Sequence, residues 1–244
     1  VVGFAGLMGA GRTELAMSIF GRSYGSKVAG EVYVHGQRVD TSTVPAAIRS
    51  GIAYVTEDRK GYGLNLIDDI RHNISAAGLR RVTRNGFVDA NAEIAVAEGY
   101  RRDLGIKAPS VLSVVGQLSG GNQQKVVLGN WLHTQPEVLI LDEPTRGIDV
   151  GAKYEIYGLV NEMVAAGKAV VIISSELQEL LGTCDRIYTV AFGRVTGEMP
   201  VSDATQENLM HLMTMDRPAD GAGLTESPAL MVGASETYAT EDVR

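Results

Sequence analysis

Val1-Val-Gly-Phe-Ala-Gly6-Leu-Met-Gly9-Ala-Gly11-Arg12-Thr13 opens the sequence and joins an apolar run to a glycine-rich segment. The run Val1–Ala5 predicts a buried strand, and the residues from Thr13 to Phe20 have apolar side chains at helical spacing. A strand, a glycine loop and a helix in this order are typical of α/β proteins that bind phosphate. We therefore predict an α/β fold that begins with such a unit.

The glycine loop fits the pattern G-x-x-x-x-G-K-[ST], except that Arg12 stands where lysine belongs. Glycines let backbone N–H groups turn inward around an anion, and the dipole of the following helix adds to the attraction. Arginine is longer and forked, and the carboxylate of Glu14 should repel phosphates. The alternative is a tight turn that binds nothing. The predicted nucleotide-binding residues here are Gly6, Met8, Gly9, Ala10, Gly11, Arg12 and Thr13.

Two acidic residues follow a second apolar run, Val138–Leu141. This run and Ala169–Ile173 predict parallel strands covered on both faces, joined by a helix over 152–166. Asp142 and Glu143 would then lie at the carboxyl edge of the sheet, where α/β proteins bind ligands. We expect Asp142 to hold Mg²⁺ together with the Thr13 hydroxyl, and Glu143 to polarise an attacking water. A solvated strand end would explain the acids, but not their placement.

A third motif is Leu118-Ser-Gly-Gly-Asn-Gln-Gln-Lys125. Two glycines after a serine, at a predicted helix start, suggest another anion site. Val126, Val127 and Trp131 give that helix an apolar face, so we expect Trp131 in the core. A plain helix N-cap would explain Ser119 but not the glycine pair and the glutamine pair together.

The rest of the chain completes the predicted architecture. We expect a mainly parallel sheet, a small antiparallel part and a helical region, in a domain over 1–215. The predicted strands are an antiparallel pair over 30–39, a strand over 52–55, and a strand with a turn over 187–195. The predicted helices lie over about 66–135, and one of them spans 90–104. Residues 216–244 lack sustained periodicity, and we expect a disordered tail.

Composition limits the function classes. A net charge of −7 gives no basic excess for nucleic acid. The apolar runs are far shorter than the roughly 20 residues of a membrane span. Cys184 is the only cysteine and should be a buried, inert thiol. The histidines have no metal-ligand spacing, so we expect surface or capping roles. The chain opens on a strand without an initiator Met, and we expect it to be part of a longer polypeptide.

The motifs LSGGNQQK and LILDEPTRGID, behind the glycine loop, resemble those of ATP-binding cassette ATPases from Val1 to about Met215. The resemblance implies a P-loop NTPase core with an inserted helical subdomain, and ATP and Mg²⁺ as ligands. Asp142 matches the Walker B acid, Glu143 the catalytic carboxylate and Asp149 the D-loop. The signature motif would comprise Leu118, Ser119, Gly120, Gly121, Asn122, Gln123 and Gln124.

The variants GLMGAGRTE, TEDRK and SSELQEL look more narrowly like the second cassette of tandem monosaccharide-importer subunits of the ribose, xylose and galactose type. In that family two cassettes pair head to tail, and each ATP lies between one phosphate loop and the partner's signature. Glu57 matches the Q-loop glutamine, and Ser175 the switch histidine that acts in catalysis. With Arg12, these departures imply a site of the chain's own that holds nucleotide but turns over slowly. An intact signature would complete the partner's site, and the family's adenine-stacking aromatic lies upstream of this sequence.

The resemblance implies an ATPase of sugar import, weak or inactive as an isolated domain, on the cytoplasmic face of the cell membrane. Its partners would be the N-terminal cassette of the same subunit, membrane permease subunits and, indirectly, a sugar-binding protein, with no nucleic acid. One alternative is a nucleotide-binding scaffold that never hydrolyses ATP. Another is a soluble cassette ATPase outside transport. The acidic balance and the short helical insertion argue against the second alternative.

Overall fold

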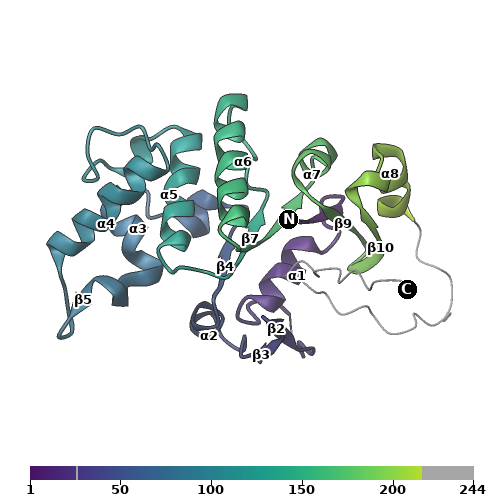
Figure 1. Ribbon diagram of the computed structural model, residues 1–244, viewed down its shortest axis with the longest axis horizontal. Coiled ribbons are helices and arrows are strands. Elements are labelled where there is room, and N and C mark those ends of the chain that lie inside the picture. Colours follow the sequence, from purple (N-terminus) through teal and green to yellow (C-terminus); the bar gives the residue numbers. More distant parts are fainter. Residues whose placement is uncertain (26, 216–244) are drawn as a thin grey trace, which may run out of the picture.

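The computed structural model describes residues 1–25 and 27–215 and is built around a six-stranded sheet (Figure 1). The strand order is β10-β9-β1-β8-β7-β4, and all neighbours are parallel except β9 and β10. The strands are β1 (Val2–Gly6), β4 (Ile52–Val55), β7 (Val138–Asp142), β8 (Ala169–Ser174), β9 (Arg186–Ala191) and β10 (Arg194–Pro200). The predicted mainly parallel sheet is confirmed.

The apolar strand residues alternate between two buried clusters, one on each face of the sheet. Phe4 and Ile140 face α1 (Arg12–Ile19), α2 (Val44–Arg49) and the antiparallel pair β2 (Val32–Val34) and β3 (Gln37–Val39). Leu139 and Ile172 face the other cluster, which α5 (Gly120–Leu132), α6 (Val150–Ala165), α7 (Leu177–Thr183) and α8 (Gln206–Thr214) cover. Burial on both faces explains why these runs are continuous rather than alternating.

A helical part projects from the β4 edge, within the predicted range 66–135 (Figure 1). It consists of α3 (Ile70–Ser75), a 3-10 helix (Ala76–Val82), α4 (Ala90–Asp103), a 3-10 turn (Val115–Gln117) and α5. The sequence did not indicate the small hairpin of β5 (Thr83–Arg84) and β6 (Phe87–Val88). Asn85 and Gly86 form its turn with φ of 51° and 83°, a left-handed pair that suits an Asn-Gly hairpin turn.

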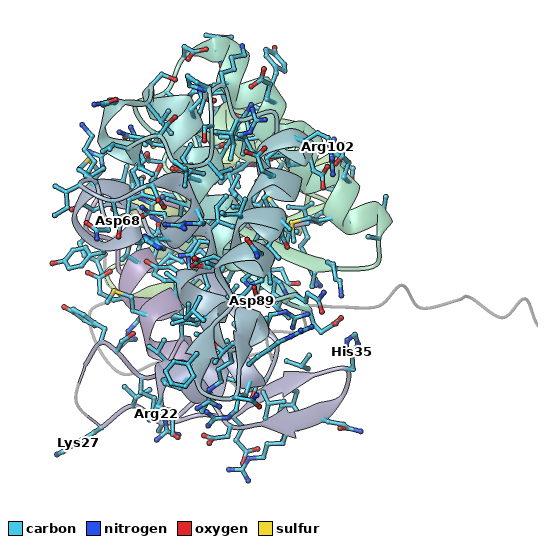
Figure 2. All side chains as sticks on the ribbon, turned by 90° about the vertical axis from the view of Figure 1, so that its left-hand side faces the viewer. Arg22, Lys27, His35, Asp68, Asp89 and Arg102 are labelled. Atoms are coloured by element: carbon cyan, nitrogen blue, oxygen red, sulfur yellow. The ribbon has the colours of Figure 1, made fainter. Side chains whose placement is uncertain are left out.

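Several other elements were not predicted. These are α2, α7, α8, a π-helix (Arg59–Gly63) and a 3-10 turn (Val201–Asp203). The strand and turn predicted over 187–195 are confirmed as β9 and the turn after it, and antiparallel β10 follows. In Figure 2, Asp68 of the helical part lies on the left of the view, and His35 of the β2–β3 turn lies lower and on the right.

Individual predictions for the core hold. Cys184 is buried, and burial raises the pKa of its thiol to about 12. Trp131 packs edge-on against Phe20 with ring centroids 5.4 Å apart.

His133 is buried at the C-cap of α5, so it is not a surface residue. No helix in the described part of the chain is long and apolar enough to cross a membrane. The predicted tail lies outside the described residues.

Candidate functional site

The loop between β1 and α1 has the shape that anion binding requires. Gly9 and Gly11 have φ of 77° and 101°, which only glycine adopts without strain. Gly11 is the N-cap of α1 and supplies no side chain to the first helical N–H groups, so they remain open to a ligand. The N–H of Gly193 in the β9–β10 turn donates to the Ala10 carbonyl at 2.7 Å and holds the loop from behind.

Arg12 folds into the protein rather than out toward solvent. Its Nη2 lies 3.3 Å from Oε1 of Glu143, and the two side chains are only 7% and 8% exposed. Its Nη1 is buried without a partner. A side chain at Gly6 would meet Arg12 Cδ at 2.9 Å, so the glycine leaves room for this conformation. Arg12, the cation of the loop, is thus already paired with the Glu143 carboxylate of the same site.

Asp142 is the most buried carboxylate of the site, at 1% exposed. The Tyr54 hydroxyl donates to its Oδ2 at 2.8 Å, whereas its Oδ1 is buried without a partner. Burial raises the pKa of Asp142, and hydrogen bonds from Thr13 and Tyr54 oppose that rise. An orphaned carboxylate oxygen beside a threonine hydroxyl is a donor set that fits Mg²⁺.

Glu143 follows β7 in a left-handed conformation with φ of 46°. Its N–H donates to the Ile173 carbonyl at 2.8 Å, which fixes this backbone against β8. The Ser175 hydroxyl donates to its Oε2 at 3.2 Å. Burial raises the pKa of Glu143, while the Ser175 hydrogen bond and the Arg12 charge lower it.

A cavity of about 220 Å³ lies over the loop. Its walls are the loop residues from Met8 to Glu14, with Glu57, Glu143 and Arg146. Glu57 and Arg146 form an ion pair across this wall. The structure therefore brings the predicted loop residues from Met8 to Thr13, Glu57 and Glu143 together around one hollow. Of the other predicted site residues, Asp142 and Ser175 contact its walls, and Gly6 does not line it.

The predicted signature residues form the start of α5 and do not line this cavity. Ser119 is the N-cap residue, but its side chain makes no capping hydrogen bond, so a plain N-cap does not explain it. Its Oγ instead accepts from Asn122 Nδ2 at 2.9 Å, and Asn122 Oδ1 accepts from the Lys107 N–H at 2.8 Å. Gln123 and Gln124 are buried, and Leu118 packs against the core. Asp149 caps α6 by accepting from the Ala152 N–H.

Four further residues contribute to the site or to the neighbouring start of α5 and were not predicted. Tyr54 holds Asp142, Arg146 pairs with Glu57, Gly193 supports the loop, and Arg59 contacts the start of α5. Arg59 and Arg146 lie within the motifs TEDRK and DEPTRGID, so attention to their charge could have found them. Tyr54 and Gly193 depend on tertiary contacts alone.

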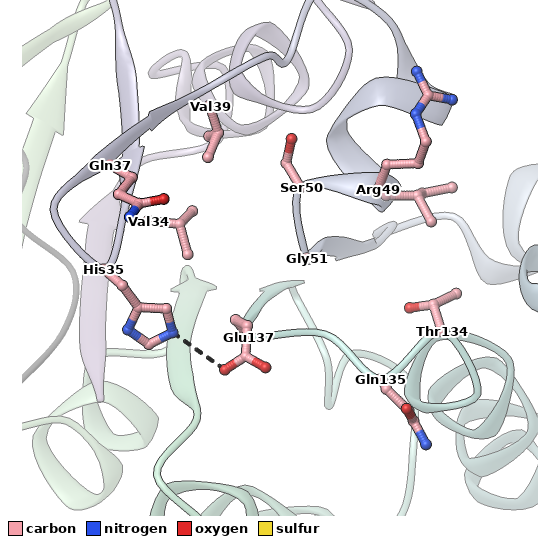
Figure 3. A pocket seen from close by; sticks show the side chains of 11 residues that line it. Val34, His35, Gln37, Val39, Arg49, Ser50, Gly51, Thr134, Gln135 and Glu137 are labelled. Atoms are coloured by element: carbon pink, nitrogen blue, oxygen red, sulfur yellow. Dashed lines mark hydrogen bonds and ion pairs between the residues drawn. The ribbon is translucent and has the colours of Figure 1, made fainter.

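A larger hollow of about 570 Å³ lies at the opposite edge of the sheet, before β4 and β7 (Figure 3). Its acidic group, Glu137, accepts from Lys168 Nζ at 2.8 Å and lies 3.3 Å from His35 Nε2. These contacts already satisfy the carboxylate, and the phosphate loop does not reach this hollow. The smaller cavity, which the phosphate loop and Glu143 line, is therefore the candidate functional site.

In the helical part, Asp68, Asp69 and His72 bring ligand atoms within 4.8 Å of one another, which the histidine spacing did not suggest. His72 Nδ1 lies 2.8 Å from Asp68, and this hydrogen bond raises the pKa of His72. The Arg71 guanidinium is 3.0 Å from Asp69. These contacts pair the charges within the cluster.

Comparison with known proteins places these features in a family. The ABC transporter family matches residues 1–146. The chain is 58% identical over 222 residues to the L-arabinose transport ATP-binding protein of Geobacillus stearothermophilus, covering 91% of the chain and 43% of that protein. It is 50% identical over 214 residues to a xylose import ATP-binding protein of Thermoanaerobacter pseudethanolicus, covering 88% and 42%. The chain thus spans less than half the length of these relatives.

Solved structures show the same fold. The ATP-binding cassette MJ1267 superposes with a TM-score of 0.69 at 20% identity, over 87% of each chain. The cassette MJ0796, in a dimeric post-hydrolysis state with ADP and Pi, gives a TM-score of 0.68 at 21% identity, over 82% of this chain and 84% of that one. The core is therefore a P-loop NTPase fold of the cassette type.

Proposed function

Because the chain belongs to the ABC transporter family, we propose that it is an ATP-binding domain of a sugar importer and couples ATP binding and hydrolysis to monosaccharide uptake. The names of its relatives, which concern arabinose and xylose import, support this proposal. The whole subunit would be the transporting ATPase, peripheral on the cytoplasmic face of the membrane, with permease subunits and a sugar-binding protein as partners.

The chain would contribute to two composite sites with a second cassette, the N-terminal domain of the same subunit. At the site on its own phosphate loop, the free amides of α1 would bind the phosphates. Thr13 and Asp142 would hold Mg²⁺, which neutralises charge on the phosphates when bound. At the other site, the start of α5 would face nucleotide held by the partner.

The observation that carries the proposal of a degenerate own site is the buried pair of Arg12 and Glu143. A catalytic carboxylate must be free to accept a hydrogen bond from the attacking water. Here Arg12 occupies one oxygen and Ser175 the other. Arg12 cannot serve the phosphates while it stays in this pair. We infer that nucleotide binds weakly and that hydrolysis requires the pair to open.

The non-hydrolysing scaffold remains the second candidate, and the same ion pair favours it. The two candidates differ in one measurable property. A slow ATPase converts bound ATP to ADP in a single turnover, whereas a scaffold returns ATP unchanged. Retention of Glu143 favours slow hydrolysis, because a pure scaffold has no need of that carboxylate.

Calorimetric titration of MgATP into the chain, beside Arg12→Lys, tests the proposal. Lysine is a compact charge that suits the space between phosphates, so Arg12→Lys should bind about tenfold more tightly than the natural chain. Arg80→Lys, at an exposed arginine of the helical part, is the matched control and should change nothing. Equal affinities for all three proteins would contradict the assigned role of Arg12.

A further inference from the structure

Two of the residues that line the smaller cavity carry a positive charge, and only one of them is exposed. Arg12 is 7% exposed and is buried against Glu143. Arg146 is 53% exposed and pairs with Glu57, which is itself 36% exposed. The cation that an anion meets on entering the cavity is therefore the guanidinium of Arg146.

The backbone of Arg146 is fixed by contacts on both sides. Its N–H donates to the Glu143 carbonyl at 3.1 Å, and its carbonyl accepts from Arg59 Nη1 at 3.0 Å. The preceding Thr145 is 1% exposed, and its hydroxyl donates to Glu179 Oε1 at 2.9 Å. The base of the Arg146 side chain is thus held beside the cavity, and its exposed guanidinium end is the part that can change partner.

The ion pair that engages this guanidinium is the weaker of the two at the site. An exposed pair gains little because water screens both charges, whereas opening a buried pair leaves each charge without water or a partner. Arg146 and Glu57 form the exposed pair. Arg12 and Glu143 form the buried one. A phosphate can therefore recruit Arg146 far more easily than Arg12.

The chemistry of the side chain suits the same exchange. A guanidinium carries five N–H donors in a planar fork. Among the described residues its ion pair is with Glu57 alone, through Nη1. The fork matches the oxygens of phosphate as well as those of a carboxylate, so a phosphate can take the place of Glu57 without a change of geometry.

The cavity also needs this charge. Its lining contains three carboxylates, those of Glu14, Glu57 and Glu143, which repel a polyphosphate. While Arg12 stays paired with Glu143, Arg146 is the cation of the lining that can offset this repulsion.

We propose that Arg146 supplies the positive charge for nucleotide phosphates at this cavity in place of Arg12, and that Glu57 holds Arg146 at the cavity wall until a phosphate arrives. The ligand class is the polyphosphate of a nucleotide. The inference rests on the proposed function, in which the phosphate loop binds ATP, and it identifies the cation that the loop lacks while Arg12 is paired.

Amide NMR of the chain, titrated with tripolyphosphate in the absence of Mg²⁺, tests the proposal at the loop itself. The amides of Gly9 and Gly11 report binding, and the metal-free probe isolates the contribution of the protein's own groups. Arg146→Gln should weaken this binding about fivefold or more, because a charge-assisted hydrogen bond is lost. Arg146→Lys keeps the charge but loses the fork, and should weaken binding about twofold.

Lys60→Gln is the matched control, since it removes the same charge from an exposed residue of the segment that follows Glu57. It should weaken binding by less than about twofold, as expected for a solvated charge. If Arg146→Gln weakens binding no more than Lys60→Gln does, Arg146 does not contact the phosphates and the inference falls.

A double-variant cycle tests the role of Glu57. Glu57→Gln releases Arg146 and removes a repelling charge, so it should strengthen binding about fivefold in the natural chain but only about twofold in the Arg146→Gln background. Glu14→Gln, at another carboxylate of the lining, should strengthen binding equally in both backgrounds. An equal gain for Glu57→Gln in both backgrounds would show that Glu57 repels phosphate without holding Arg146.

The same titration separates this inference from the proposed function on which it rests. If Gly9 and Gly11 shift in the natural chain and equally in Arg146→Gln, the loop binds polyphosphate and the role of Arg146 alone is refuted. If they shift in none of these proteins, the loop binds no polyphosphate, and the proposed function of the site falls together with the inference.

Discussion

The starts of α1 and α5 are built alike and charged differently. Gly9 and Gly11 precede α1, Gly120 and Gly121 are the first residues of α5, and neither helix has a side-chain cap. At α1 the cation Arg12 is buried against Glu143, and Glu14 adds a carboxylate to the first turn. At α5 the cation Arg59 has no carboxylate partner among the described residues, and the first turn has no acid.

The difference shows that a phosphate-binding motif does not by itself reveal whether its positive charge is free. The α1 end already has internal counter-charges, so an incoming phosphate must compete with them. At the α5 end the Asp149 carboxylate lies close by, with its Oδ2 3.9 Å from the position of a Cβ on Gly121, whereas Arg59 donates to the Arg146 carbonyl. The two ends thus differ in whether the cation is buried in an ion pair.

Removing the counter-charge should give the largest contrast between the two ends. Glu143→Ala leaves Arg12 buried and unpaired, which should lower the free energy of unfolding by about 3–5 kcal/mol. Arg59→Ala breaks no ion pair and should lower it by no more than about 1 kcal/mol. Urea unfolding followed by circular dichroism measures both, and equal losses would erase the comparison. The double variant Arg12→Met with Glu143→Leu should recover most of the loss.

The far end of α5 offers a second contrast, of intermediate size. Burial and the charge of Arg81 lower the pKa of His133 below its ordinary 6.5. As the pH falls through that value the unfolded chain takes up more of a proton at this residue than the native protein does, so the free energy of unfolding falls toward acid. His133→Phe keeps a ring beside Gly78 and removes the titrating group.

Between about pH 7.5 and about pH 5.5, the natural chain should therefore lose up to about 1 kcal/mol more than His133→Phe. Urea unfolding at the two pH values measures this difference. A variant with the same acid dependence as the natural chain would show that His133 titrates normally in the folded state.

The smallest effect concerns Ser119 itself. Since its side chain caps nothing, Ser119→Ala should change the free energy of unfolding by less than about 0.5 kcal/mol. Asp149→Ala removes a true cap from α6 and should lower it by about 1 kcal/mol. Thermal unfolding of the two variants side by side checks the contrast. A larger loss for Ser119→Ala would mean that its Oγ contact with Asn122 holds the end of α5.

The sequence predicted the parts of this molecule that depend on local patterns. Continuous apolar runs identified β7 and β8, and glycine spacing identified the phosphate loop. The helix α8 was missed because Asn208, rather than Glu or Gln, completes its capping box with Thr205. The helix α2 had a signal in Thr43 and Pro45 that went unused.

Contacts between distant residues were beyond prediction. The sequence indicated that Glu14 would repel phosphate, yet it could not show that Arg12 turns inward to Glu143. That choice depends on the space beside Gly6, which is a property of packing. The contact between Arg59 and Gly120 likewise depends on how the π-helix meets α5, and no local pattern encodes it.

The position of β1 in the sheet also sets the order in which the protein can be assembled during synthesis. Val2 pairs with Val171 of β8 on one side and with Arg186 of β9 on the other. During synthesis β1 therefore does not have both of these neighbours until the chain as far as residue 191 has been made. Such non-local pairing is slow, and an apolar strand with two open edges invites wrong partners while it waits. The phosphate loop, which directly follows β1, therefore takes shape late in the assembly of this domain.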